Sequence, residues 1–288
     1  MVTLDLKAVT TPVGILRLLA VVLTCITFSL VASVGYTTET FWTYCMFTWC
    51  FCFCVTILII VLELTSLSAK LPISWNDFTT AFAMLAGLMV LVASIVYPRF
   101  YACQTCGRQI GASVTSWLCY IVYLTEVILT RAKPGEISGF LSTVPGLLKV
   151  LEAFVACVIF ICLDYTGYYV FAGLKWCVAV YSICFIFAIL VIILTICRLL
   201  TRFPAPFDKV LIVCNVLAVL MYITAAVIWP LYSFRNNPRP SLCDLPNVFC
   251  GWDLLVVITV MTYLNLIAYI VDTVYSFRLV FFVSRTAE

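Results

Sequence analysis

The sequence contains no histidine, and only 10% of its 288 residues are charged. Without imidazole the chain cannot form Ser–His or Cys–His nucleophile pairs, and metal sites that need histidine ligands are excluded. Soluble domains are usually about 25% charged and about 45–50% apolar, whereas this chain is 65% hydrophobic. Its polar residues are too few to cover a globule in water. We therefore expect an integral membrane protein.

The sequence also lacks the signatures of nucleotide sites and of hydrolytic active sites. It holds no P-loop, no dinucleotide-binding fingerprint, no paired catalytic carboxylates and no Asn-x-Ser/Thr sequon. The net charge is only +3, and no basic run indicates nucleic-acid binding. We expect no enzymatic activity, no cofactor and no nucleic-acid partner.

Long apolar runs are abundant instead, with proline and glycine in the gaps, as at Pro98 and Pro134. A helix needs about 20 apolar residues to cross a hydrocarbon core about 30 Å thick. The runs are continuous, whereas a β-barrel needs alternating segments of about ten residues. We therefore predict an all-α protein with eight transmembrane helices: 14–36, 41–65, 77–97, 110–130, 144–163, 174–197, 208–232 and 252–275.

The positive charges favour one orientation in the membrane, because Lys and Arg accumulate in cytosolic loops. If the N-terminus is cytosolic, eleven of the sixteen basic residues fall on the cytosolic side. The other five lie outside: Arg99, Arg108, Lys175, Arg235 and Arg239. We expect both termini in the cytosol.

An internal repeat divides the chain into two halves. A glycine, a basic residue, a leucine, a cysteine and a phenylalanine recur at an offset of 132: Gly14, Arg17, Leu19, Cys25 and Phe28 match Gly146, Lys149, Leu151, Cys157 and Phe160. We align the next helix at an offset of 134, which matches Trp42 with Trp176. We predict two tandem four-helix units, 8–134 and 139–284. Because four is an even number, they form a parallel repeat.

Six charged residues lie within or at the edge of the apolar runs: Arg17, Glu63, Glu126, Lys149, Glu152 and Asp272. Each buried charge needs a partner, water or protonation. Their positions place all six near the cytosolic helix ends, so we predict structural pairs of Arg17 with Glu63 or Glu126, and of Lys149 with Asp272. Glu152, at i+3 from Lys149, is expected to join the second pair. The alternative is a proton or ion relay, which would have to extend through mid-membrane.

Most of the sixteen cysteines lie inside apolar runs, where a thiol acts as a small hydrophobe. A helix directs the thiols of the group Cys45, Cys50, Cys52 and Cys54 to different sides rather than toward one metal ion. We interpret it as packing.

The cysteines of the outer loops meet an oxidising environment, in which disulfides persist. We predict a Cys243–Cys250 disulfide and a matching Cys103–Cys106 pair, with cross-unit pairing and free thiols as alternatives. Cys197, beside Arg198 at the cytosolic surface, suits S-palmitoylation. An unmodified thiol there is the alternative.

Several segments resemble the myeloid-associated differentiation marker family: TVPGLLKVLEAFVAC at 143–157, RAKPGEI at 131–137, TFSLVAS at 27–33, FTWCFCF at 47–53 and WCVAVYS at 176–182. The similarity covers nearly the whole chain. The N-terminal segment is short and without the founding member's Thr/Ser-rich leader, so we expect a greater similarity to the "-like" members. The resemblance implies two MARVEL domains, four-helix units associated with membrane apposition, cholesterol-rich rafts and vesicle or junction traffic. It implies no catalytic residues.

Two functional hypotheses follow. The first is a non-enzymatic protein of the plasma membrane or of vesicles that organises membrane domains through lateral contacts. Its partners are then membrane lipids, including cholesterol-rich domains, other membrane proteins and further copies of itself. The second is a small-solute or ion transporter or channel, which eight helices and a tandem repeat also suit.

Overall fold

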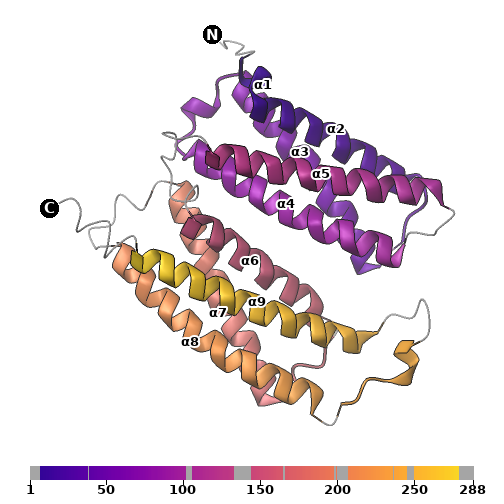
Figure 1. The fold of residues 1–288 in the computed structure, drawn as a ribbon, viewed down its shortest axis with the longest axis vertical. Helices are drawn as coiled ribbons and strands as arrows, with labels where there is room; N and C mark the ends of the chain where they lie inside the picture. Colours follow the sequence, from indigo (N-terminus) through magenta and orange to yellow (C-terminus); the bar gives the residue numbers. More distant parts are fainter. Residues whose placement is uncertain are drawn as a thin grey trace. The chain divides into compact units, whose positions relative to one another are not determined.

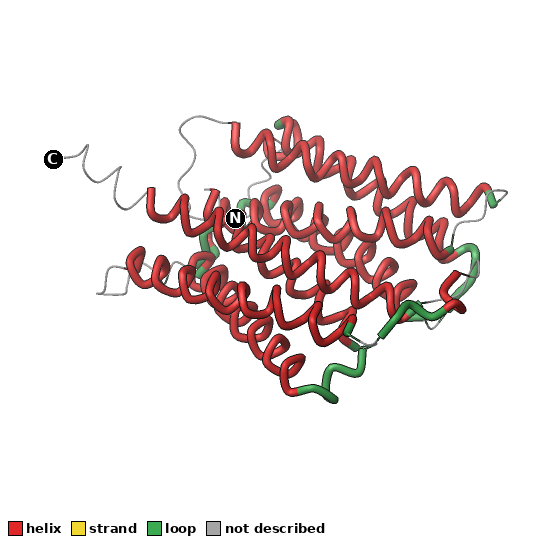
Figure 2. The backbone as a smooth tube through the Cα atoms, turned by 60° about the horizontal axis from the view of Figure 1, so that its bottom comes forward, coloured by secondary structure: helices red, strands yellow, loops and turns green. Residues whose placement is uncertain are grey.

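The computed structural model describes residues 7–37, 39–101, 106–132, 144–164, 166–197, 199, 207–235, 237–244 and 250–278. The regular structure in these ranges is helical throughout, and eight of the helices are long and apolar enough to cross a membrane (Figure 2). The chain divides into two compact units, Met1–Ser142 and Thr143–Glu288.

The first unit is a closed ring of four helices (Figure 1). Its elements are α1 (Lys7–Thr10), α2 (Pro12–Ala32), α3 (Thr40–Leu64), the 3₁₀ turn η1 (Ser68–Lys70), α4 (Trp75–Phe100) and α5 (Gly107–Ala132). Each long helix packs against the one that follows it, and α5 closes the ring against α2. Sequential helices joined by short loops therefore run antiparallel.

The second unit repeats this arrangement. Its elements are α6 (Val144–Leu163), α7 (Ala172–Ile196), α8 (Phe207–Phe234), the 3₁₀ turn η4 (Ser241–Asp244) and α9 (Gly251–Arg278). Here α9 closes the ring against α6. The fold is thus two four-helix units in tandem.

Most helix ends differ from the prediction by a few residues, and two of these differences have a clear physical cause. Helix α2 ends at Ala32 rather than at Tyr36, because Ser33 caps it and Gly35 takes a φ of 133°, which is open to glycine. Helix α4 continues two residues past Pro98 to Phe100, so placing that proline in a gap was wrong. A proline in the last turn removes only one backbone hydrogen bond, which the helix tolerates.

The interior contacts show that the offset of 132 continues through the second helix of each unit. Three contacts recur at this offset: Cys45 to the Ala93 carbonyl and Cys177 to the Ala225 carbonyl, Phe28 on Phe53 and Phe160 on Phe185, Trp49 on Tyr97 and Tyr181 on Trp229. The predicted offset of 134 was therefore wrong. It matched buried Trp42 with Trp176, which is 44% exposed. A shift of two residues turns a side chain by about 200° around a helix, so sequence likeness alone misplaced the inner face.

Trp49 is a central side chain in the core of the first unit. It is fully buried, its Nε1 donates a hydrogen bond to Ser116 Oγ at 3.0 Å, and its ring packs edge-on against Tyr97 at 5.4 Å. Ser116 in turn shares a 2.7 Å hydrogen bond with Ser94. The indole thus joins α3, α4 and α5.

We expect Trp49→Ala to lower the free energy of unfolding by about 3–5 kcal/mol, because it leaves a large cavity. Trp117, which is 41% exposed, provides the matched control, and Trp117→Ala should change stability by about 0.5 kcal/mol or less. Denaturant titration in detergent micelles measures both. Equal losses for the two variants would contradict this account of the core.

Candidate functional site

Arg17 links three helices of the first unit near one end of the ring. It lies five residues after Pro12, the first residue of α2, while Glu63 and Glu126 lie near the ends of α3 and α5. Because neighbouring helices run antiparallel, these positions meet at the same end. Arg17 Nε donates to Glu126 Oε1 at 2.7 Å, and Nη1 donates to both Glu63 oxygens at 2.6 Å.

Burial differs between the two acids of this first cluster, Arg17–Glu63–Glu126. The Glu126 side chain is 4% exposed, whereas the Glu63 side chain is 20% exposed. Trp75 Nε1 at the start of α4 also donates to Glu63 Oε1 at 2.9 Å. All four long helices of the unit are therefore bonded to one another through the first cluster, and its Glu63 carboxylate is partly exposed at the surface of the unit.

Lys149 occupies the equivalent place in the second unit, five residues after Val144 in α6. Its ammonium nitrogen lies 2.7 Å from Glu152 Oε2, 2.7 Å from Asn215 Oδ1 and 2.9 Å from Asp272 Oδ2. These three contacts use all three N–H donors of the ammonium group. Lys149, Glu152 and Asp272, with Asn215, form the second cluster, and all four are 0% exposed.

Neutral groups complete the second cluster. Asn215 Nδ2 donates to Asp272 Oδ2 at 2.8 Å, so this amide bridges the lysine and the aspartate. The ammonium also lies over the ring of Tyr269 at 4.8 Å and that of Phe187 at 5.2 Å. Cation–π attraction to the two rings further stabilises the ammonium group, because the site is desolvated.

In each cluster one cation is bonded to two carboxylates. One of the two acids lies on the same helix in both units, and the other lies on a different helix. Arg17 corresponds to Lys149 at the offset of 132, and Glu126 matches Asp272 near the end of the fourth helix. The remaining acid is Glu63 on α3 in the first unit and Glu152 on α6 in the second. Each unit thus bonds its first helix to its last by a buried ion pair.

These clusters suit helix attachment better than ligand binding. The first cluster's cation is bonded to both of its carboxylates, and within the described residues no group of three or more Cys, Asp or Glu side chains is placed to hold a metal. Three of the acids lie near the ends of their helices, but Glu152 is the ninth of the twenty residues of α6 and lies deeper than the sequence predicted.

Two of the cysteines predicted to lie in outer loops, Cys243 and Cys250, are at the end of the second unit opposite its charged cluster. A disulfide joins Cys243 to Cys250 across the connection between α8 and α9, with an S–S distance of 2.05 Å. Cys103 lies outside the described residues, so its pairing with Cys106 stays a prediction.

The remaining cysteines are distributed around the helices. Cys45 and Cys52 are buried, Cys50 is half-buried and Cys54 is exposed, so their thiols do not converge. Cys197 is half-buried at the C-terminal cap of α7. Its palmitoylation stays a prediction.

Sequence reasoning missed the amides of the second unit. Asn215 and Asn265 are both fully buried, and Asn265 Nδ2 donates to Tyr222 Oη at 2.6 Å and to the Glu152 main-chain carbonyl at 3.3 Å. An asparagine inside an apolar run is itself a signal, because an unpaired amide in lipid costs several kcal/mol.

We expect Arg17→Leu to lower stability by about 3–5 kcal/mol, because it leaves Glu126 buried without its cation. The double variant Arg17→Leu/Glu126→Gln should recover much of this loss, since no buried charge then lacks a partner. Thermal unfolding in micelles measures both. The exposed pair of Arg239 with Asp253 at 3.1 Å is the control, and Arg239→Leu should cost about 1 kcal/mol or less. A double variant no more stable than the single would show that Glu126 does not depend on Arg17.

Comparison with known proteins identifies the family. The model of the membrane-associating domain, MARVEL, matches residues 8–129 and again residues 140–275. The myeloid-associated differentiation marker homolog of Xenopus laevis is 46% identical over 94% of this chain and 93% of its own length. The human myeloid-associated differentiation marker is 45% identical over 96% of this chain and 90% of its own.

A "-like" relative is slightly less similar than these two, which does not support the expected greater similarity to the "-like" members. The myeloid-associated differentiation marker-like protein 2 of Rattus norvegicus is 42% identical over 96% of this chain and 95% of its own length. No solved structure matches the chain. Both the family model and the full-length relatives lead to the same conclusion: the chain is a multi-pass membrane protein that belongs to the myeloid-associated differentiation marker family and carries two MARVEL domains in tandem.

Proposed function

We propose that this protein is a non-enzymatic organiser of membrane domains, which acts by lateral association with lipids and other membrane proteins. The observation that carries the proposal is the division of polarity in each unit. The charged clusters are bonded inside the helix rings, whereas large apolar side chains cover their outsides. The outward residues of α2 are an example: Ile15, Leu18, Leu19, Val22 and Ile26.

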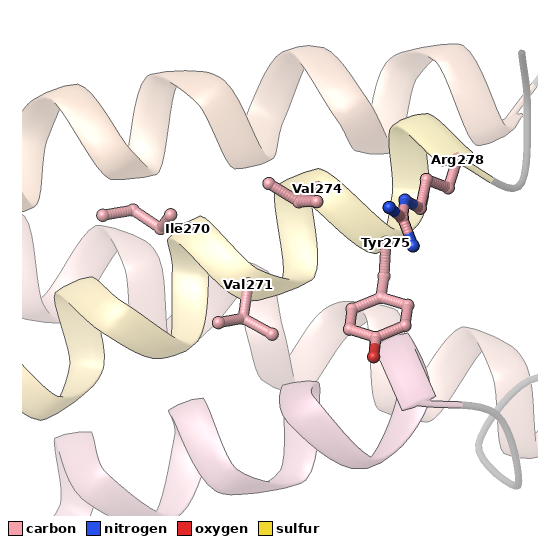
Figure 3. A pocket seen from close by; sticks show the side chains of 5 residues that line it. All are labelled: Ile270, Val271, Val274, Tyr275 and Arg278. Atoms are coloured by element: carbon pink, nitrogen blue, oxygen red, sulfur yellow. The ribbon is translucent and has the colours of Figure 1, made fainter.

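A groove on α9 favours an anionic phospholipid as one lateral partner. It has a volume of about 300 Å³ and is lined by Ile270, Val271, Val274, Tyr275 and Arg278 (Figure 3). The walls are apolar, and the exposed Arg278 stands at the end of the helix. An acyl chain would pack against the apolar side chains of the groove, and a headgroup phosphate would pair with the Arg278 guanidinium.

The interior hydroxyls favour this function over transport. A transporter needs polar groups that face a hydrated path near the bilayer midplane. Thr24 instead donates to the Ala20 carbonyl at 2.8 Å, Ser94 to the Val90 carbonyl at 2.7 Å and Thr262 to the Ile258 carbonyl at 2.7 Å. A hydroxyl bonded to its own helix does not have to line water.

The orientation is part of the proposal. The excess of Lys and Arg places both termini in the cytosol. The second cluster then lies at the cytosolic end of its unit, and the Cys243–Cys250 loop lies outside. Arg278 then faces the cytosolic leaflet, which is rich in anionic lipid.

Epitope tags at either terminus should stain cells only after permeabilisation. A membrane-impermeant thiol reagent applied after reduction should reach Cys243 and Cys250 from outside, and alkylation without reduction should find both blocked. Surface staining of intact cells by a terminal tag would contradict the orientation, and two thiols found free without reduction would contradict the disulfide.

In vesicles that contain a spin-labelled anionic phospholipid, we expect the protein to immobilise a lipid fraction that Arg278→Gln reduces. The cause is the loss of Arg278, the one charged side chain among the described residues that line the groove. Arg108→Gln, at the start of α5, is the control and should leave this fraction unchanged. Equal immobilisation by the wild type and Arg278→Gln would reject the groove as a lipid site.

The same vesicles test the transporter hypothesis. Ion and proton flux should not exceed that of protein-free vesicles. A reproducible flux that Glu126→Ala or Asp272→Ala abolishes would favour the transporter hypothesis over the organiser.

A further inference from the structure

The second cluster contains one more negative than positive group if both of its acids are ionised. Lys149, Glu152 and Asp272 are each 0% exposed, so solvent cannot compensate the excess charge. An uncompensated charge in such a site costs several kcal/mol. The first cluster has the same count, but its Glu63 side chain is 20% exposed and can be hydrated. The second cluster therefore needs one additional positive charge.

Asp272 has the surroundings of an ionised carboxylate. Its Oδ2 accepts from Lys149 at 2.9 Å and from Asn215 at 2.8 Å, and its Oδ1 accepts from Ser276 Oγ at 3.3 Å. Three donors on two oxygens favour the charged form.

Glu152 has different surroundings. Its Oε2 accepts from Lys149 at 2.7 Å, but its Oε1 is fully buried and has no hydrogen-bond partner among the described residues. Lys149 cannot supply one, because its three donors are already used on Glu152 Oε2, Asn215 and Asp272. A buried carboxylate oxygen without a donor is costly, whereas a protonated oxygen is itself a donor.

An acceptor for such a donor belongs to the same neighbourhood. Asn265 uses its amide N–H groups on the Glu152 main-chain carbonyl and on Tyr222. Its Oδ1 is buried and also lacks a partner within the described part of the chain. Asn265 therefore contacts the main chain of Glu152, and each of the two side chains carries a buried acceptor without a donor. A proton on Glu152 Oε1 that reached Asn265 Oδ1 would satisfy both.

The other titratable groups at this site do not change the charge count. Tyr269 on α9 donates its hydroxyl to the Cys184 carbonyl of α7 at 3.1 Å, and Tyr222 on α8 is bonded to Asn265. Tyrosine and cysteine are ordinarily neutral at pH 7. The missing charge must therefore be a bound cation or a proton on an acid.

We propose that Glu152 is a buried proton-binding site: in the folded protein it holds a proton on Oε1 and donates it toward Asn265 Oδ1, while Lys149 pairs with ionised Asp272. The proton comes from water, and no electron moves. A metal cation fits less well. Magnesium and calcium take at least six oxygen ligands, whereas Glu152 and Asn265 offer two unpartnered oxygens beside the Lys149 ammonium group.

Infrared spectroscopy of the full chain in lipid at neutral pH tests the assignment. The wild type should show the carbonyl stretching band of a protonated carboxylic acid. Glu152→Gln should lose this band, because glutamine keeps the shape of the neutral acid but carries no carboxyl group. Asp253→Asn, which changes an exposed acid, should keep it.

A second variant guards against misfolding of Glu152→Gln. Asn265→Leu removes the acceptor at similar volume, so the band should persist and move to higher frequency as its hydrogen bond is lost. The proposal is overturned if the wild type shows no such band, or if Glu126→Gln removes it while Glu152→Gln does not. A band seen only in the absence of sodium would assign the missing charge to a metal cation and would also overturn the proposal.

Discussion

A hydrocarbon environment offers no hydrogen bonds, so polar atoms within it must find partners inside the protein. This constraint explains the arrangement of each unit. Helices satisfy the backbone, threonine hydroxyls such as that of Thr24 return to their own helix, and the cations Arg17 and Lys149 are surrounded by carboxylate and amide oxygens. With the strongly polar groups inside, the outer surfaces of the helices are left to aliphatic side chains. The inward-facing chemistry and the lipid-facing surface are therefore two results of one requirement.

The spans could be predicted from the sequence because membrane thickness imposes a length that few other structures require. The six charged candidates could also be selected, since a charge in an apolar run is conspicuous. Their exact partners could not. Arg17 contacts both Glu63 and Glu126, where the sequence offered one or the other, because a guanidinium presents several donors and the helix rotation decides which acids it reaches.

Helix rotation is also the reason that other features were missed. The alignment at an offset of 134 followed matching residue types on the second helix of each unit, but the buried face repeats at 132. Asn215 and Asn265 escaped notice because the six candidates were selected by charge, and a neutral amide carries none. Their importance depends on which atoms face them, and only the packed bundle shows that Asn215 bridges Lys149 and Asp272.

The aromatic contact between the second and third helices is reversed between the units. Tryptophan lies on α3 and tyrosine on α4 in the first unit, whereas tyrosine lies on α7 and tryptophan on α8 in the second. Transplanting α7 alone into the place of α3 would bring two tyrosines together and leave a void. Transplanting α8 alone into the place of α4 would force two indoles into space for one. At this contact, therefore, neither the second nor the third helix could be exchanged alone between the units, and the two would have to be exchanged together.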